Sequence, residues 1–232
     1  MSRSNAGSRV GGAAALLLLG LLAAPIANAR HGHRSHGGVA GAFDGYLLAL
    51  SWSPAYCAGG GRGPECTGRR PYGFVVHGLW PQRDRGRIEY CATRERVPAQ
   101  TVRALAPWMP SRSLVFHEWE AHGSCSGLAP RDYFAQLVHA ASGVAVPVGF
   151  RAPAAARTVA PRVIVREFRH ADPALPVSAI VVVCRHGAPP RFTELRICLD
   201  RSLRARPCSR AVRARGCRAP LVRILPMRRA GD

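Results

Sequence analysis

Eight cysteines constrain the fold of this 232-residue chain more than any other feature of its sequence. They lie at positions 57, 66, 91, 125, 184, 198, 208 and 217, and no two of them form a C-x-x-C pair. This spacing argues against a redox motif and against a zinc ribbon. An even number of cysteines in an exported chain is typical of a disulfide framework, but the positions alone leave the pairing open.

The N-terminus has the pattern of a secretory signal peptide. Arg3 and Arg9 precede a short run of Ala and Leu, and an Ala-Asn-Ala site ends at Ala29. We therefore expect residues 1–29 to be cleaved after Ala29 and the protein to be secreted or periplasmic. The apolar run is too short and too rich in Ala and Gly to predict a stable membrane span. Residues 30–42 predict a flexible tail, which leaves residues 43–232 as one domain.

The charge of the chain points to a polyanionic partner. Lys and Arg together number 33 against 13 acidic residues, and the formal net charge is +20. All of the basic residues apart from histidine are Arg. Surfaces of this kind attract phosphate backbones, although a cationic protein without a specific partner has the same composition.

Apolar segments and turn residues predict an α+β domain. Strands are expected in residues 46–53, ended by Pro54, and in residues 72–80, stopped by Gly78 and Pro81. Ser111 or Ser113 can cap a helix that runs through His122. Further helices are expected in residues 98–110, 130–143 and 160–172, and further strands in residues 179–184 and 195–200.

The segment FHEWEAHGSCSG, residues 116–127, concentrates reactive side chains. Zinc peptidases use H-E-x-x-H, in which two histidines share one helix face. Here His117 and His122 are five residues apart, roughly 140° around a helix, so chelation of one metal ion is not expected. Cys125 as the nucleophile of a thiol enzyme is the other alternative, but a disulfide is favoured in an exported chain with an even cysteine count.

Acid/base chemistry fits this segment better. Glu118 and His122 are four residues apart and share a helix face, and a neighbouring carboxylate raises the pKa of an imidazole. His77, in FVVHGLWPQ, is the second candidate, because a strand end can direct a side chain into a cleft. Two imidazoles suit cleavage next to a ribose 2′-hydroxyl: one accepts its proton and the other protonates the leaving 5′-oxygen. This reaction needs no metal or other cofactor, and DNA lacks the nucleophile.

The remaining histidines and one tryptophan are expected to have structural roles. A lone histidine most often has a hydrogen-bonded packing role, which we expect for His139, His170 and His186. We expect Trp119 to pack in the core.

With both segments considered, the chain resembles the ribonuclease T2 family. The two signature segments of that family are similar to FVVHGLWPQ (74–82) and FHEWEAHGSC (116–125). Further similarity covers residues 47–57, 132–137 and 195–200. The resemblance implies a single disulfide-bonded α+β domain with a central, mostly antiparallel sheet and flanking helices. It also implies endonucleolytic cleavage of single-stranded RNA through 2′,3′-cyclic phosphates.

Residue roles follow from the same resemblance. His77 matches the general acid, His122 the general base and Glu118 a catalytic carboxylate. His117 matches a phosphate-binding histidine, and Trp80 an aromatic residue beside the base and phosphate site. The family-like layout also implies four disulfides: Cys57–Cys66, Cys91–Cys125, Cys184–Cys217 and Cys198–Cys208.

One position departs from the family pattern. The family commonly has Lys just before the base of the second segment, where this chain has Ala121, and the chain contains no Lys at all. An arginine such as Arg112 or Arg131 is the candidate replacement. The departure bears on the catalytic rate more than on the type of reaction.

Three functions remain open from the sequence. The first is an exported, monomeric ribonuclease with RNA as its substrate. The second is a cationic RNA-binding or membrane-active protein whose catalysis is weakened or lost, and Ala121 is its support. The third is a secreted metallohydrolase, which inhibition by EDTA would distinguish from the other two.

Overall fold

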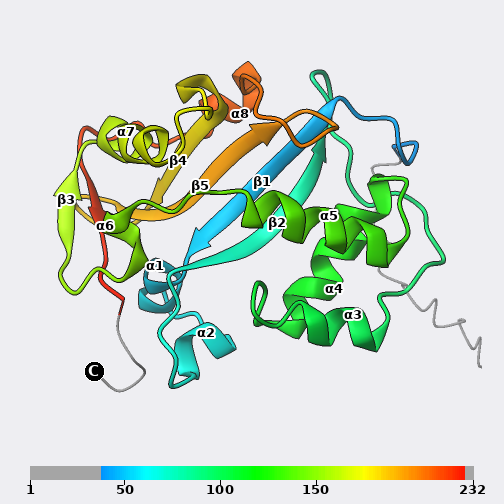
Figure 1. Ribbon diagram of the computed structural model, residues 1–232, viewed down its shortest axis with the longest axis horizontal. Coiled ribbons are helices and arrows are strands. Elements are labelled where there is room, and N and C mark those ends of the chain that lie inside the picture. The colour runs from blue at the N-terminus through cyan, green and yellow to red at the C-terminus, as the bar shows by residue number, and fades with distance from the viewer. Residues whose placement is uncertain (1–37, 228–232) are drawn as a thin grey trace, which may run out of the picture. The chain divides into compact units, whose positions relative to one another are not determined.

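Six strands form one sheet in residues 38–227, the part of the chain that the computed structural model describes (Figure 1). The order is β2-β1-β5-β6-β3, and β4 pairs with β5. All pairs are antiparallel except β5 with β6. The strands are β1 (Gly45–Trp52), β2 (Phe74–Gln82), β3 (Arg157–Val159), β4 (Ile180–Arg185), β5 (Arg191–Leu199) and β6 (Val222–Ile224).

Helices flank this sheet, and α3, α4 and α5 gather beside β2 (Figure 1). The combination confirms the expected α+β fold with a mostly antiparallel central sheet. The α-helices are α1 (Ser53–Ala58), α2 (Pro64–Thr67), α3 (Ala99–Ala104), α4 (Arg112–Ala121), α5 (Pro130–Ser142), α6 (Val148–Arg151), α7 (Pro161–Ala171) and α8 (Arg210–Ala214), and two 3₁₀ turns cover Gly123–Cys125 and Val177–Ala179.

Strand β1 lies inside the sheet because both of its faces are apolar. Leu48, Leu50 and Trp52 belong to the larger core cluster, whereas Leu47 belongs to a smaller cluster on the other side. Since alternate residues of a strand point to opposite faces, this division places one core on each face of the sheet. The two cores therefore bury β1 on both faces of the sheet.

Strand β2 continues past the residues that were expected to stop it. Gly78 pairs with Ala49, and Pro81 pairs with Tyr46. Pro81 is tolerated because β2 is the edge strand of the sheet and its outer side needs no continuous row of donors. The register skips His77, since Val76 pairs with Leu50 and Gly78 with Ala49. His77 is therefore the extra residue of a β-bulge, a feature that re-aims a side chain.

Helix α4 begins where the sequence predicted and ends one residue early. The Ser111 hydroxyl accepts a hydrogen bond from the Leu114 amide at 3.4 Å, as an N-cap does. The helix ends at Ala121, and His122 has φ −128° and ψ −51°. Its buried face carries Val115, Glu118 and Trp119. Glu118 is thus a carboxylate on the core side of a helix.

Four disulfides join the eight cysteines, and they are the pairs that the family resemblance implied: Cys57–Cys66, Cys91–Cys125, Cys184–Cys217 and Cys198–Cys208. Cys91–Cys125 connects the loop after β2 to the turn after α4. Beside it, the Tyr90 amide donates to the Ala121 carbonyl at 2.8 Å. This connection holds the chain after His77 against the chain around His122.

The predicted signal peptide, residues 1–29, lies outside the described residues, and so does most of the predicted tail. The last residues of that tail, 38–42, are described. The Gly41 amide donates to the Cys125 carbonyl at 2.9 Å, and the Gly41 carbonyl accepts a hydrogen bond from Arg201. This short stretch is therefore attached to the turn after α4.

Candidate active site

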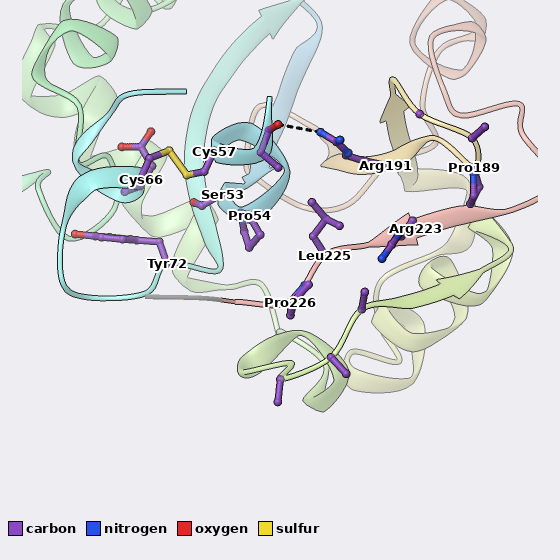
Figure 2. Close-up of a pocket in the computed structure, with 17 residues that line it drawn as sticks. Ser53, Pro54, Cys57, Cys66, Tyr72, Pro189, Arg191, Arg223, Leu225 and Pro226 are labelled. Carbon is purple, nitrogen blue, oxygen red and sulfur yellow. Dashed lines mark hydrogen bonds between the residues drawn. A yellow bond between two sulfur atoms is a disulfide. The ribbon is translucent and has the colours of Figure 1, made fainter. Parts of the chain in front are cut away.

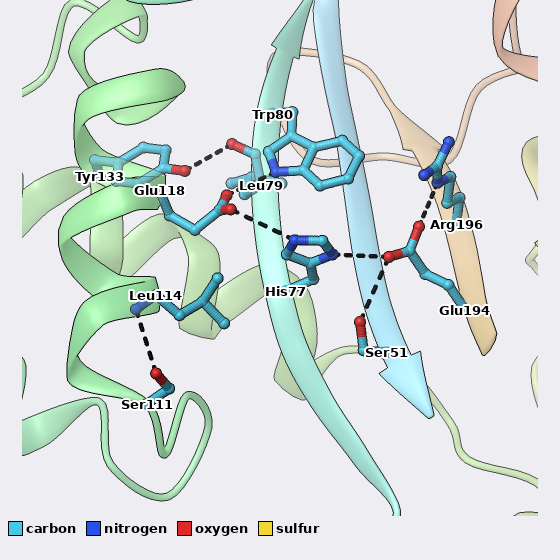
Figure 3. Close-up of polar contacts among 10 residues, drawn as sticks. All are labelled: Ser51, His77, Leu79, Trp80, Ser111, Leu114, Glu118, Tyr133, Glu194 and Arg196. Carbon is cyan, nitrogen blue, oxygen red and sulfur yellow. Dashed lines mark hydrogen bonds and ion pairs between the residues drawn. The ribbon is translucent and has the colours of Figure 1, made fainter. Parts of the chain in front are cut away.

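His77 lies between two carboxylates at the bulge of β2 (Figure 3). Its Nδ1 is 2.8 Å from Oε2 of Glu194 on β5, and its Nε2 is 3.7 Å from Oε1 of Glu118 on α4. Burial lowers the pKa of His77, but the hydrogen bond to Glu194 and the charges of Glu118 and Glu194 outweigh it and raise the pKa above its ordinary value. His77 is thereby favoured as an imidazolium that is 35% exposed.

Glu118 is buried and points toward the sheet. Its Oε2 accepts a hydrogen bond from Trp80 Nε1 at 2.7 Å. Burial is the main reason that the pKa of Glu118 rises to about 7, against the opposing effects of His77 and Trp80. Only glycine fits beneath this contact, since a Cβ on Gly78 would lie 2.0 Å from Glu118 Oε2. Gly78 is therefore part of the site's construction.

His122 sits just beyond the last residue of α4 and packs against Trp80. Their ring centroids are 5.2 Å apart with an interplanar angle of 33°. Burial, followed by the charges of His117, His77 and Arg87, lowers the pKa of His122 to about 3. Its Nδ1 is buried and has no hydrogen-bond partner. His122 is therefore a neutral imidazole at ordinary pH.

The predicted partnership between Glu118 and His122 is wrong. It assumed that both residues share one helix face and that the carboxylate raises the pKa of the imidazole. Because α4 ends at Ala121, His122 leaves the helical path, and Glu118 contacts His77 and Trp80 instead. The histidine whose pKa is raised by carboxylates is His77.

Trp80 is the common neighbour of both histidines. Its ring lies 5.1 Å from His77 and 5.2 Å from His122, and the Arg196 guanidinium lies over it at 5.2 Å. The indole is partly exposed, whereas Trp119 is buried and donates to the Glu95 carbonyl at 3.1 Å. Trp119 thus packs in the core as expected, and Trp80 faces the cleft.

His117 lies on the exposed side of α4 and shares a hollow with His77. This hollow has a volume of about 370 Å³, and its lining also includes Ser111, Ser113 and Leu114. The structure thus brings together all five predicted site residues, with His117 at the outer edge.

Arginines line a second hollow, beside Trp80 and His122. A cavity of about 290 Å³ beside Trp80 and His122 is lined by four of them: Arg83, Arg87, Arg196 and Arg215. Ala121 is only 2% exposed, so the position of the family's lysine lies inside the protein here. Arg112 begins α4, roughly 15 Å along the helix axis from His122, which is too far to replace that lysine.

Two further site residues, Glu194 and Arg196, were not predicted from the sequence. Both are buried, and the Arg196 Nε donates to Glu194 Oε1 at 2.5 Å. The sequence does contain one indication of this pair. Glu194 and Arg196 are two positions apart at the beginning of the apolar segment LRICLD, so they lie on the same face of a strand. The sequence does not show that this face meets His77, two strands away.

The expected packing role of three other histidines is wrong. His139, His170 and His186 are all exposed. They lie at surface positions on α5, on α7 and in the turn after β4.

A larger cavity of about 880 Å³ lies apart from these residues (Figure 2). Ser53, Tyr72, Arg191 and Arg223 are among its lining residues, and none of the five predicted site residues is. Its volume exceeds that of the hollows around His77 and His122, but no histidine is among its lining residues. The smaller hollows are therefore the candidate site.

Two features of the described residues bear on the other functions considered. No group of three or more His, Cys, Asp or Glu side chains in residues 38–227 is arranged to hold a metal ion. No helix in the same residues is long and apolar enough to cross a membrane.

The chain is similar in sequence to proteins named as ribonucleases. Residues 43–147 match the model of the Ribonuclease T2 family. Over 119 residues the chain is 45% identical to a protein named "Ribonuclease" from Aeromonas hydrophila, which covers 51% of this chain and 53% of that protein. It is 37% identical over 111 residues to a "Probable ribonuclease" from Haemophilus influenzae, with 40% of each chain covered. The chain thus matches about half the length of these relatives.

Solved structures share the fold. One is trichomaglin, described as a novel S-like ribonuclease, with a TM-score of 0.60, 20% identity, and coverage of 80% of this chain and 98% of that one. Another is RNase NT, solved in complex with 5′-AMP, with a TM-score of 0.57, 18% identity, and coverage of 80% and 99%. At these identities the likeness concerns the fold alone.

Proposed function

We propose that this chain is an endoribonuclease of the ribonuclease T2 family; the match of residues 43–147 to that family's model and the geometry of the cleft support the proposal. Its substrate is single-stranded RNA, and cleavage proceeds by metal-independent acid/base transesterification. The observation that carries the proposal is the pair of histidines on Trp80 whose pKa values are shifted in opposite directions.

The opposite shifts assign the two roles. His77 is favoured as an imidazolium and is the general acid, whereas His122 is neutral and is the general base. After burial, the electrostatic effects of His117, His77 and Arg87 contribute to the low pKa of His122. A bound phosphate would offset their charge and raise the basicity of His122 in the enzyme–substrate complex.

The reaction transfers two protons and exchanges two bonds to phosphorus. His122 removes the proton of the ribose 2′-hydroxyl, and the 2′-oxygen attacks the adjacent phosphorus. The bond from phosphorus to the 5′-oxygen breaks, and His77 donates its proton to that oxygen. The products are a 2′,3′-cyclic phosphate and a 5′-hydroxyl. DNA has no 2′-hydroxyl and is not cleaved.

Other side chains bind the substrate and stabilise its phosphate. His117 binds phosphate from the outer edge of the cleft, and Glu118 and Trp80 lie beside the two catalytic histidines. Arg87 and Arg196 provide the positive charge that the family obtains from the lysine missing at Ala121. Such a group stabilises the charge that develops on the phosphoryl oxygens.

We also propose that the protein is exported and acts as a monomer. The basic and apolar character of residues 1–29 and the presence of four disulfides support export to a secreted or periplasmic location. A single chain contributes every group of the proposed site.

Incubation with matched RNA and DNA oligonucleotides in EDTA tests the function. We expect RNA fragments with cyclic phosphate and 5′-hydroxyl ends, and intact DNA. Binding of RNA without cleavage would favour a cationic binding protein with lost catalysis, and activity that EDTA abolishes would favour a metallohydrolase.

A further inference from the structure

We propose that Glu194 is a positioning residue for His77: its buried carboxylate binds Nδ1, fixes the imidazole ring and leaves Nε2 as the nitrogen that donates the proton. This inference rests on the proposed function for its catalytic meaning. The contact itself can be tested without any enzymatic activity.

Glu194 reaches His77 across a whole strand. The two residues are on β5 and β2, which lie on either side of β1, and two neighbouring strands are about 5 Å apart. The bulge turns His77 toward β5, and Ser51, the β1 residue that pairs with Glu194, has a small side chain (Figure 3). The resulting contact between Nδ1 and Oε2 is 2.8 Å.

The carboxylate of Glu194 is held at both oxygens. Arg196 donates to Oε1 from the same strand, while the Ser51 hydroxyl donates to Oε2 at 3.4 Å. Glu194 is 6% exposed, so water has little access to it. Because an ionised carboxylate only accepts hydrogen bonds, His77 must carry a proton on Nδ1. The ring is then unable to turn without losing this bond.

Glu194, and not Glu118, is the permanent anion beside His77. Burial raises the pKa of Glu194, but the hydrogen bond to His77 and the charge of Arg196 outweigh it and hold the pKa below its ordinary value. Glu118 has a pKa of about 7 and is partly protonated at neutral pH. The two carboxylates therefore have different roles: Glu194 orients and charges His77 from Nδ1, and Glu118 lies near Nε2.

Other charged groups also face His77. Glu118 approaches from α4, Arg196 from β5 and His122 from the end of α4. The hollows on either side of His77 are lined by Arg62, Glu65, His117, Arg185 and His186. Glu194 alone among these groups hydrogen-bonds His77 Nδ1.

The test variant removes the negative charge of Glu194 but keeps the size and shape of its side chain. In Glu194→Gln we expect the pKa of the His77 ring, followed by ¹⁵N–¹H NMR, to fall by about one pH unit or more. We expect the alkaline limb of the kcat profile to move down with it, because the general acid must be protonated. Above that pH kcat should fall about tenfold, with KM nearly unchanged.

The matched control is Glu167→Gln, since Glu167 also pairs with an arginine, Arg157, but lies on α7. It should leave the His77 titration and the kcat profile unchanged. An unchanged His77 pKa in Glu194→Gln, or a loss of activity without movement of the alkaline limb, would overturn the proposal.

A second variant separates positioning from folding. Glu194→Gln leaves Arg196 buried without its partner, so Glu194→Gln/Arg196→Gln removes both charges together. This double variant should still show the lowered His77 pKa if Glu194 sets it. If wild-type protein cleaves no RNA, the proposed function fails, while the NMR titration still decides the contact between Glu194 and His77.

Discussion

The side chains of the cleft are so close that one methyl group would disturb them. Glu118 and Trp80 meet directly above Gly78, which has no Cβ to obstruct them. The sequence interpretation treated Gly78 as the end of a strand, but its role is to admit a buried carboxylate. The absence of a side chain at Gly78 therefore determines where Glu118 lies relative to His77.

Gly78→Ala is expected to lower both activity and stability. The new Cβ would displace Glu118 or Trp80 and distort the surroundings of His77, and overpacking of this kind costs about 1–3 kcal/mol. Steady-state kinetics and thermal unfolding should both change. The control is Gly143→Ala, where the nearest atom to a new Cβ is 3.6 Å away. Equal effects of the two substitutions would show that Gly78 has no special role.

His77→Ala and His122→Ala should each reduce kcat/KM for RNA by about 10²–10⁴-fold, because each removes one proton-transfer group. The double variant should lose less than the product of the two, since the histidines act in one step. Affinity for a non-cleavable 2′-deoxy oligonucleotide should be largely retained. His170→Ala, on the exposed side of α7, is the control. Near-normal cleavage by either single variant would remove that histidine from the mechanism.

At the scale of elements, the helices and strands that are marked by local sequence patterns were predictable. The cores of β1, β4 and β5 and the helices α3, α4, α5 and α7 came from apolar periodicity, caps and prolines. The short strands β3 and β6 were missed because three residues carry almost no periodicity. The bulge at His77 and the approach of Glu194 were missed because they depend on pairing between strands, which is a tertiary property.

The Cys91–Cys125 bridge is the element-level link between the two histidines. Replacing both cysteines with Ala should lower the free energy of unfolding by about 2–4 kcal/mol and should also lower kcat, since the turn after α4 is released from the loop after β2. Chemical denaturation and kinetics of the folded protein measure the two effects. The matched control removes Cys184–Cys217, which closes a loop of similar length: 33 residues against 34. It should cost similar stability but leave kcat unchanged, and a loss of kcat in both variants would refute the link.

The whole molecule is strongly cationic, with a formal net charge of +20. Arginines line the cleft beside Trp80 and His122, so RNA binding should displace cations condensed on the RNA backbone. The sequence alone predicted a polyanionic partner from this excess charge. It did not predict which arginines meet the cleft, because Arg83 and Arg87 follow β2, whereas Arg196 is on β5 and Arg215 follows α8, and only folding brings these three segments together.

Affinity for a single-stranded, non-cleavable oligonucleotide should therefore fall steeply with salt, by about 0.7 logarithmic units per tenfold change in salt for each phosphate contacted. Fluorescence anisotropy over a salt series measures the slope. An oligonucleotide with neutral methylphosphonate links is the control and should show little dependence. A flat response for the charged oligonucleotide would show that the arginines do not contact its backbone.

The bridge between the loop after β2 and the turn after α4 also carries a consequence for the producing cell. Thiols stay reduced in a typical cytoplasm and are oxidised outside it. Newly made chains would therefore have Cys91 and Cys125 unlinked while they are still among the cell's own transcripts. If the protein is an exported ribonuclease as proposed, full competence would be acquired only after translocation, and the oxidation state of one cysteine pair would act as a safeguard against self-inflicted RNA damage.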